Sequence, residues 1–447
     1  MHPNSKYYYI KSYGCQMSDL DSLQMARLLQ GEGYQSTTDP ECAQVILINT
    51  CSVREKPVQK LYSDIGRMRS LKLQNPEMIL GVTGCQAQAD GKKLLSHFGY
   101  LDLVLGPDQL KKLPELLREL LLKRRQALEV KFESKEDYQF LHLVPQEGES
   151  ETKAFVSIMK GCDNFCSFCI VPYVRGREVS RDSYDIIQET KHLVQLGVQE
   201  VTLLGQNVNS YGNKRGDSVN FSKLLSMIAD QTQLKRLRFT TSHPKDLSDA
   251  LIEQFKVNPI LAPHLHLPLQ SASDAVLARM YRGYTLKEYL DKLNRLRDAN
   301  PDVAVTTDII VGFPGETAAD FELTMQLITE VEYDSIYGFV YSPRPKTTAA
   351  QYFADDVTQE IKAARLQQVL DLQQSITARK NLARVGKIEE VLVEGPSKLG
   401  ETVQGRSPHN RIVHFQGGPE WVGKFVSVKI TGAQNNSLRG EPITYGR

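Results

Sequence analysis

Three cysteines lie within eight positions of one another in the segment KGCDNFCSFCIVP: Cys162, Cys166 and Cys169. Three thiolates on one short loop can bind three irons of a 4Fe-4S cubane. A structural zinc site needs a fourth ligand, and no further His or Cys follows close by in the sequence. The spacing therefore predicts a cluster whose fourth iron is open to a small molecule, on a loop packed by Phe165 and Phe168. The alternatives are a chance grouping or a zinc site with a distant fourth ligand.

A second set of cysteines is spread along the chain: Cys15, Cys51 and Cys85, at intervals of 36 and 34 positions. Each follows an apolar run that predicts a strand. Because the carboxyl ends of parallel strands share one edge of a sheet, beside helix N-termini, the three thiols are expected to meet there. They predict a second open-cornered cluster, although a single cysteine of this kind is more often a small buried hydrophobe. Cys42 precedes a strand and is expected to be an incidental thiol.

The elements that must position these cysteines form two alternations of strand and helix. In residues 1–130, strands separated by one helix predict an α/β domain with a doubly wound parallel sheet. Its basic segment 110–126 is expected to be an amphipathic helix with a solvated face. The polar residues 131–152 predict a linker with at most a short edge strand.

The second alternation covers residues 153–384 and contains six predicted strands. It predicts a partial (β/α)6 barrel, whose chemistry would lie at the C-terminal strand ends. The polar strand tails GQN, TSHP, LQS and GFPGE would then face one mouth. In residues 385–447, short apolar runs separated by Gly, Pro and Asn predict a small antiparallel β-barrel of the kind that binds oligonucleotides.

The composition excludes several classes of protein. The chain has 447 residues, of which 41% are hydrophobic and 24% charged, and a formal net charge of +1. It is therefore neither fibrous nor disordered, and no overall field attracts it to nucleic acid or to a membrane. The first residues carry no targeting pattern, and nowhere do about 18 apolar residues follow one another. We expect a cytoplasmic protein without a membrane partner, in which the cysteines are metal ligands or core thiols rather than disulfides.

The CxxxCxxC motif after the first barrel strand resembles that of the radical S-adenosylmethionine superfamily. Together with YGCQM, NTCSVRE, TGCQAQ, VPYVRGRE, LHLPLQSASD and DIIVGFPGET, it makes the chain resemble the methylthiotransferase family along nearly its whole length. Within that family it resembles the enzymes that act on N6-isopentenyl(dimethylallyl)adenosine in tRNA. The resemblance implies an N-terminal methylthiotransferase domain, a radical-SAM barrel and a terminal TRAM domain. SAS at 271–273 and SPRPKT at 342–347 depart from the family's usual SGS and SPRPGT, which puts only the geometry of those loops in doubt.

The reaction that the resemblance implies is methylthiolation of C2 of the adenosine at tRNA position 37. The C2–H bond is too weakly acidic for a side-chain base near neutral pH, so a cofactor radical must open it. The resemblance implies two 4Fe-4S clusters and two S-adenosylmethionine molecules, one giving its methyl group to a cluster-bound sulfur and the other yielding the radical. Implied partners are the tRNA anticodon loop, an electron donor and a sulfur or cluster donor protein. No catalytic residue beyond the cluster ligands is assigned.

The resemblance also implies a set of S-adenosylmethionine contacts at the strand ends. Gly205, Gln206 and Asn207 would line the methionine end, Ser242 and Gln270 the middle, and Ile310 and Gly312 the adenine. The alternative is that such polar residues only cap the helices that follow.

Three arginines directly after the cluster loop, Arg175, Arg177 and Arg181, are predicted to bind RNA phosphates near the reacting base. The alternative is a solvated charged face. From Arg384 onward nine Lys and Arg stand against six Asp and Glu, which suits RNA with unstacked bases, whereas Phe415 and Trp421 are expected in the core of so small a barrel.

Two alternatives for the function stay open at this point. The chain could methylthiolate another target, either threonylcarbamoyl-adenosine in tRNA or an aspartate of a ribosomal protein. It could also be an RNA-binding protein stabilised by zinc, which would bind no iron.

Overall fold

The computed structural model describes residues 6–53, 55–123, 125–142, 151–213, 219–397, 400 and 402–443, so residues 143–150 of the predicted linker lie outside the described part. The chain forms two compact units. The first comprises Met1–Leu143, Lys160–Asp163 and Cys169–Val179, and the second comprises Val144–Met159, Asn164–Phe168 and Ser180–Arg447. Two of the boundaries between the units fall within the short strands β8 (Met159–Lys160) and β9 (Val179–Ser180).

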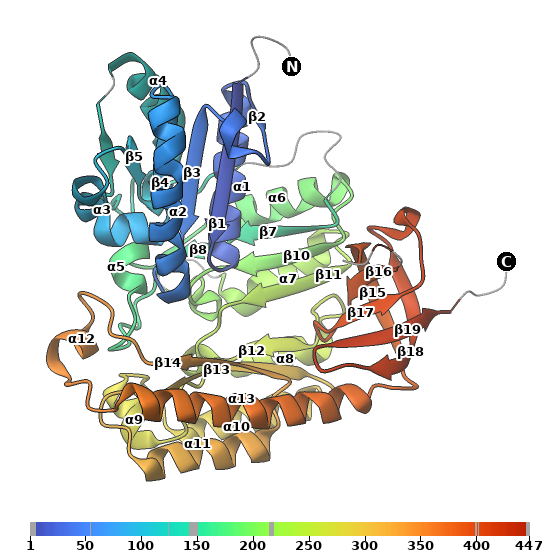
Figure 1. Cartoon of the computed structure of the whole chain (residues 1–447). Coiled ribbons are helices and arrows are strands. Elements are labelled where there is room, and N and C mark those ends of the chain that lie inside the picture. The colour runs from blue at the N-terminus through green and yellow to red at the C-terminus, as the bar shows by residue number, and fades with distance from the viewer. Residues whose placement is uncertain are drawn as a thin grey trace. The chain divides into compact units, whose positions relative to one another are not determined.

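The first unit is built on a parallel sheet with the strand order β2-β1-β3-β4-β5-β6 (Figure 1). Its strands are β1 (Lys6–Tyr13), β2 (Tyr34–Ser36), β3 (Val45–Thr50), β4 (Ile79–Thr83), β5 (Leu103–Leu105) and β6 (Ala127–Glu129). Its helices are α1 (Gln16–Gly31), α2 (Glu55–Gln74), α3 (Cys85–His97), α4 (Leu113–Lys123) and α5 (Val171–Arg175). The edge strand β6 ends just before the predicted linker of residues 131–152.

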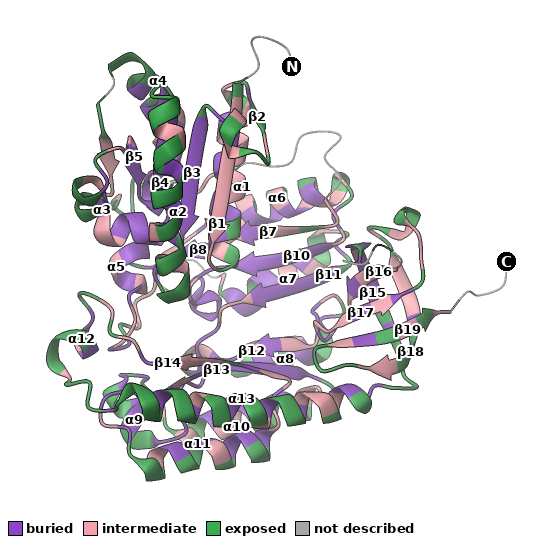
Figure 2. Cartoon of the chain, viewed as in Figure 1, coloured by how far each residue is buried: buried purple, intermediate pink, exposed green. Residues whose placement is uncertain are grey.

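Two separate apolar cores show why this sheet is covered on both faces. Val45 and Leu47 of β3 pack with residues of α1 and α4, whereas Ile46 and Ile48 pack with residues of α2 and α3. Every residue of β3 is buried, as its continuous colour in Figure 2 shows. Because successive side chains of a strand point to opposite faces, the apolar run VILI supplies both cores. The predicted doubly wound sheet is confirmed. The predicted helix of segment 110–126 is α4, which buries its leucines and exposes its charged residues.

In its described residues, the second unit contains six parallel barrel strands. They are β7 (Lys153–Ser157), β10 (Glu200–Leu204), β11 (Arg236–Thr240), β12 (His264–His266), β13 (Ala304–Val311) and β14 (Ser335–Val340). The sheets β11-β10-β7 and β12-β13-β14 are linked by a parallel bridge between Leu237 and Leu261. The surrounding helices are α6 (Ser183–Gln195), α7 (Phe221–Gln231), α8 (Asp249–Val257), α9 (Asp274–Arg279), α10 (Leu286–Ala299), α11 (Ala318–Val331), α12 (Thr348–Tyr352) and α13 (Gln359–Leu382). The partial (β/α)6 barrel is confirmed.

The same unit ends in a closed barrel with the strand order β15-β16-β17-β19-β18. Its strands are β15 (Ile388–Pro396), β16 (Val403–Arg406), β17 (Ile412–Phe415), β18 (Phe425–Ala433) and β19 (Ser437–Pro442). Four of the five strand pairs are antiparallel as expected, but β17 and β19 pair in parallel and close the barrel. Phe415 is buried in the core and Trp421 packs against it, which confirms their predicted structural role.

Within the unit, two buried arginines of the (β/α) barrel donate hydrogen bonds to backbone carbonyls of this closed barrel. Arg238 donates to the carbonyl oxygens of Ser407 and Pro408 at 2.8 and 2.9 Å, and Nε donates to Glu200 at 2.9 Å. Arg236 donates to the carbonyl oxygens of Glu390 and Arg406. Within the described part of the chain, no helix has the length and apolar character needed to cross a membrane.

Candidate active site

Cys15, Cys51 and Cys85 all follow the carboxyl ends of strands of the first unit. Cys15 caps the N-terminus of α1, Cys51 follows β3, and Cys85 begins α3 directly after β4. The pKa of Cys15 is lowered to about 5, chiefly because its thiolate is stabilised by the neighbouring thiol of Cys51. The interaction with Cys15, burial and the charge of Cys85 raise the pKa of Cys51. The structure thus brings the three thiols together at one sheet edge, as the parallel topology predicts.

A buried ion pair lies beside Cys85. Arg175, the last residue of α5, donates from Nε to Cys85 Sγ at 3.1 Å. Its two terminal nitrogens donate to Asp21 on α1, at 3.2 and 2.5 Å. Arg175 is 6% exposed and Asp21 5%. Arg175 is therefore committed to protein partners here, and the expectation that it contacts RNA phosphates needs correction, because burial leaves its guanidinium no open face.

The motif loop contributes to both units: Cys162 and Cys169 belong to the first, Cys166 to the second. In the first unit, Cys162 N donates to the carbonyl of Gly176 at 3.2 Å. A Cβ at Gly161, where φ is +76°, would lie 2.1 Å from the carbonyl oxygen of Arg177, so only glycine lets the loop pass there.

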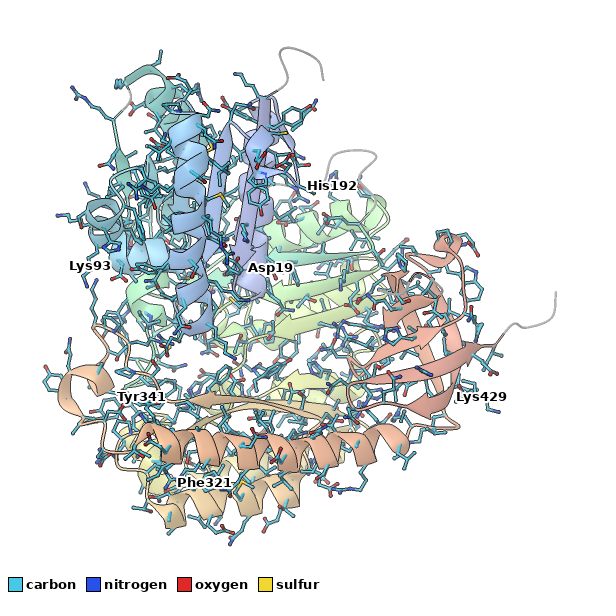
Figure 3. All side chains as sticks on the ribbon, viewed as in Figure 1. Asp19, Lys93, His192, Phe321, Tyr341 and Lys429 are labelled. Carbon is cyan, nitrogen blue, oxygen red and sulfur yellow. The ribbon has the colours of Figure 1, made fainter. Side chains whose placement is uncertain are left out.

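In the second unit, Cys166 is buried beside an arginine and a histidine. Arg282 Nη1 lies 3.4 Å from its sulfur, and His243 Nε2 lies 4.0 Å away. Phe168 packs against the small core of Met280, Phe313 and Tyr341, the last of which is labelled in Figure 3. Phe165, the other phenylalanine predicted to pack the loop, is 39% exposed, and its backbone has φ +47°.

An iron–sulfur cluster makes different demands on the thiols than a single metal ion. Among the described residues, no three His, Cys, Asp or Glu side chains converge on a point where one metal ion could be held. In a cubane each thiolate binds a different iron, so the sulfurs lie around the cluster rather than around one point. The thiol of lowered pKa at Cys15 and the donor to Cys85 are features that favour bound thiolate.

The predicted S-adenosylmethionine contacts lie at the carboxyl ends of barrel strands, and three of them carry a buried polar atom that finds no hydrogen-bond partner within the described residues. These atoms are Asn207 Oδ1, Ser242 Oγ and Gln270 Oε1. Gln270 has φ +83°, and its backbone bonds to Asp308 and Ile310. Because unpaired buried oxygens cost free energy, they suit a bound polar ligand.

These residues supply no side-chain cap to the described helices: Asn207 precedes the 3-10 helix Val208–Ser210, but its side chain makes no cap bond there. The helices α7, α8, α9 and α11 are capped instead by Asn220, Ser248, Ser273 and Thr317. The predicted glycines serve close packing: a Cβ at Gly205 would lie 2.5 Å from Met159 Cγ, and one at Gly312, where φ is +69°, would lie 2.2 Å from Lys362 Cγ. Gln206 precedes Asn207 in the sequence, and the backbone N–H of Ile310 donates to the carbonyl oxygen of Gln270 at 2.9 Å.

The other two arginines of the basic run lie in different surroundings. Arg181 is 3% exposed, pairs with Glu189 at 2.5 Å and donates to the carbonyl of Ser157, so burial removes it from any RNA surface. The side chain of Arg177 is 62% exposed and pairs with Asp163 at 2.5 Å. Only Arg177 keeps the exposure that a phosphate contact requires.

Sequence reasoning did not single out Asp21, His243, Arg282 or Tyr284. Arg282 follows Cys166 by 116 positions, and Arg175 follows Cys85 by 90. No motif spacing links such pairs, and only the tertiary contacts connect them.

Three family models match successive parts of the chain. They are the uncharacterized protein family UPF0004 at residues 7–106, the radical SAM superfamily at 156–328 and the TRAM domain at 382–443. Among curated proteins, the tRNA-2-methylthio-N(6)-dimethylallyladenosine synthase of Geobacter sulfurreducens is 49% identical over 441 residues, covering 98% of each chain. That of Geobacter metallireducens is 50% identical over 438 residues, again covering 98% of each.

A solved structure resembles the fold at much lower sequence identity. The radical S-adenosylmethionine methyltransferase TsrM of Kitasatospora setae, solved with cobalamin and a 4Fe-4S cluster, matches with a TM-score of 0.58 and 14% identity over 77% of each chain. This likeness bears on the fold alone.

Proposed function

The chain belongs to the family of tRNA-2-methylthio-N(6)-dimethylallyladenosine synthases, and on that premise we propose that it methylthiolates C2 of N6-isopentenyl(dimethylallyl)adenosine at tRNA position 37 as a radical S-adenosylmethionine enzyme. The observation that carries the proposal is the meeting of Cys15, Cys51 and Cys85 at one sheet edge. Enzymes that only generate a radical need one cluster, whereas transfer of a methylthio group also requires a source of sulfur.

We propose two 4Fe-4S clusters. The auxiliary cluster is bound by Cys15, Cys51 and Cys85, and the barrel cluster by Cys162, Cys166 and Cys169. When bound, a cluster with an open iron supplies the single electron that starts radical chemistry at a C–H bond no side-chain base can open. The protein binds and orients the reactants and keeps water from the site.

The strand-end residues hold S-adenosylmethionine in this proposal. Asn207, Ser242 and Gln270 offer buried oxygens without a partner in the described part of the chain, and S-adenosylmethionine carries amino and hydroxyl donors for them. Gly205 and Gly312 let neighbouring side chains pack closely behind the loops that carry these groups. Gln206 and Ile310 complete the set.

The tRNA partner is supported by the names of the relatives and by the TRAM domain. We propose that the anticodon loop is the part bound, with Arg177 as a phosphate contact and the basic terminal barrel as a further surface. We further propose an electron donor and a sulfur or cluster donor as protein partners, and a cytoplasmic location. The proposed domains comprise residues 1–130, 153–384 and 385–447.

Iron analysis of the anaerobically reconstituted chain tests the clusters. We expect about eight irons per chain, and about half of that in Cys51→Ala and in Cys162→Ala. Cys42→Ala is the matched control, because Cys42 lies near Asp39 at the other end of the strands, and it should keep all the iron. Colourless protein that binds zinc would instead support the zinc-stabilised RNA-binding alternative.

Mass spectrometry of tRNA after reaction tests the substrate. The 2-methylthio-isopentenyl nucleoside should appear with isopentenylated tRNA and should be absent with tRNA that carries threonylcarbamoyl-adenosine. Methylthiolation of the latter, or of a ribosomal aspartate, would overturn the proposed substrate, and relatives 49% and 50% identical weigh against both.

A further inference from the structure

Arg175 joins Cys85 and Asp21 in a buried chain of hydrogen bonds within the first unit. Its Nε reaches Cys85 Sγ at 3.1 Å while its two terminal nitrogens reach both oxygens of Asp21. The guanidinium is planar and presents its donors in a rigid fork. With one edge on the carboxylate, the remaining Nε–H is directed at the sulfur, so Asp21 orients the donor that Cys85 accepts.

This arrangement places a full positive charge beside the proposed auxiliary ligands, away from water. Arg175 Nε lies 3.1 Å from Cys85 Sγ, and Arg175, Cys85 and Asp21 are all buried. The sulfur of Cys85 therefore faces a guanidinium that the carboxylate of Asp21 holds in place.

Stability alone does not explain why a buried ion pair, rather than apolar side chains, occupies this position. Ile170 and Val174 pack beside Cys85 in an apolar cluster, so well-packed apolar side chains could fill the space around α5. Burying an arginine and an aspartate costs desolvation free energy that such a pair often only just offsets. The hydrogen bond from Arg175 Nε to the sulfur of Cys85 indicates that the pair acts on a cluster ligand.

We propose that Arg175, oriented by Asp21, is a positioning residue for the auxiliary cluster that strengthens its retention and raises its reduction potential. The inference rests on the proposed function, because it takes Cys85 as a cluster ligand. A hydrogen bond to a ligand sulfur and a nearby positive charge both stabilise the reduced cluster, which carries the more negative charge. Removal of the charge of Arg175 lowers the potential, and removal of the charge of Asp21 raises it.

The test uses the full chain with Cys162, Cys166 and Cys169 all changed to alanine, so that only the auxiliary cluster contributes. In this background Arg175→Met, Arg175→Lys and Asp21→Asn are compared by iron content, by the electron paramagnetic resonance spectrum of the reduced cluster and by its midpoint potential. Lys72→Met is the matched control. It breaks the ion pair in which Lys72 Nζ lies 2.7 Å from Asp102 Oδ2, and Asp102 lies just before β5, at the other end of the strands.

We expect Arg175→Met to shift the potential negatively by about 59 mV, which corresponds to a tenfold change for a one-electron couple. Iron loss to a chelator should become roughly 10- to 100-fold easier. Arg175→Lys, which keeps the charge but cannot bridge both partners, should lie between Arg175→Met and the parent chain. Asp21→Asn should shift the potential in the positive direction, and Lys72→Met should leave potential and spectrum unchanged.

Shifts of the same sign in Arg175→Met and Asp21→Asn would point to general loosening and overturn the inference, as would an unchanged potential in Arg175→Met. Folding is checked by circular dichroism, and if Arg175→Met does not fold, Arg175→Lys and Asp21→Asn decide the matter through their signs. A parent chain without about four irons would overturn the proposed function itself. Iron in the parent with no effect of Arg175 would overturn only the inference.

Discussion

Arg282 lies with Nη1 3.4 Å from Cys166 Sγ, although 116 positions separate the two residues. The same guanidinium donates from Nη2 to the carbonyl of Pro268 at 2.6 Å and from Nε to Tyr284 Oη at 2.9 Å. Arg282 is buried, so these contacts hold it in one place. The barrel thus brings a fixed cation to the middle cysteine of the motif.

Arg282→Lys should impair the barrel cluster, because a single ammonium cannot reach Cys166, Pro268 and Tyr284 together. We expect reductive cleavage of S-adenosylmethionine to fall by roughly 10- to 100-fold, with an altered spectrum of the reduced cluster. Release of 5′-deoxyadenosine under a chemical reductant measures the first quantity. Arg295→Lys is the control, since Arg295 forms an exposed pair with Asp249 and should change neither. Equal effects of the two substitutions would contradict the prediction.

Ser242→Ala should weaken binding of S-adenosylmethionine without lowering stability. Ser242 Oγ is buried and has no hydrogen-bond partner within the described residues, so its removal costs the free chain no contact. The lost bond to the ligand is worth about 1 kcal/mol, or roughly fivefold in Kd by equilibrium dialysis.

Ser226→Ala provides the contrast, because Ser226 Oγ bonds to Gln254 at 3.3 Å away from the strand ends. That variant should lower the melting temperature and leave the Kd unchanged. The prediction fails if Ser242→Ala behaves like Ser226→Ala in both measurements.

Glu389→Gln should flatten the acid dependence of stability of the closed barrel. Burial raises the pKa of Glu389, but the neighbouring His409, whose Nδ1 lies 3.4 Å from Oε2, and the charge of Arg384 together hold that pKa below its usual range. A carboxyl group with a lowered folded pKa stabilises the fold above its unfolded pKa of about 4.3, and that stability disappears as the pH falls through the folded value. Glutamine removes this contribution.

Urea unfolding followed by fluorescence measures this effect, since Trp421 is the only tryptophan and lies against the core of the closed barrel. The wild-type midpoint should fall between about pH 5 and pH 3, and the Glu389→Gln midpoint should fall less steeply. Glu441→Gln, at an exposed position of β19, should keep the wild-type slope. Parallel curves for Glu389→Gln and the wild type would refute the assignment.

Arg238→Met should loosen the closed barrel from the (β/α) barrel. It removes the bonds to the carbonyls of Ser407 and Pro408 and leaves the buried carboxylate of Glu200 with Arg236 alone, 3.6 Å away. Loss of one partner of a buried pair costs about 3–5 kcal/mol. The unfolding transition followed by Trp421 fluorescence should move to lower urea in Arg238→Met. Arg439→Met, at an exposed position of β19, is the control and should move it little. Equal shifts of the two variants would exclude this role for Arg238.

The alternation of strands and helices was predictable because each β-α unit carries its own pattern. The run VILI of β3 predicts a strand buried on both faces, and the structure has it between two cores. Even the meeting of Cys15, Cys51 and Cys85 was predictable, since it follows from parallel topology alone. The parallel pairing of β17 with β19 was not, because it depends on how a barrel of five short strands closes.

The three arginines after the motif mark the limit of this reasoning. Arg175 and Arg181 are buried in ion pairs and Arg177 is mostly exposed, although all three lie within seven positions of charged sequence. The path of α5 and of the turns around it decides which side chain meets Asp21, Glu189 or solvent, and that path depends on packing against distant elements.

The sequence by itself determined the two sets of thiols, the order of strands and helices and the type of chemistry they suit. Local spacing and strand topology constrain these features wherever the rest of the chain lies. Only the tertiary structure decided that Arg175 and Arg282 each reach a cysteine from 90 and 116 positions away. Such contacts arise from the packing of whole elements, and no local pattern in the sequence encodes which distant charge a given sulfur will meet.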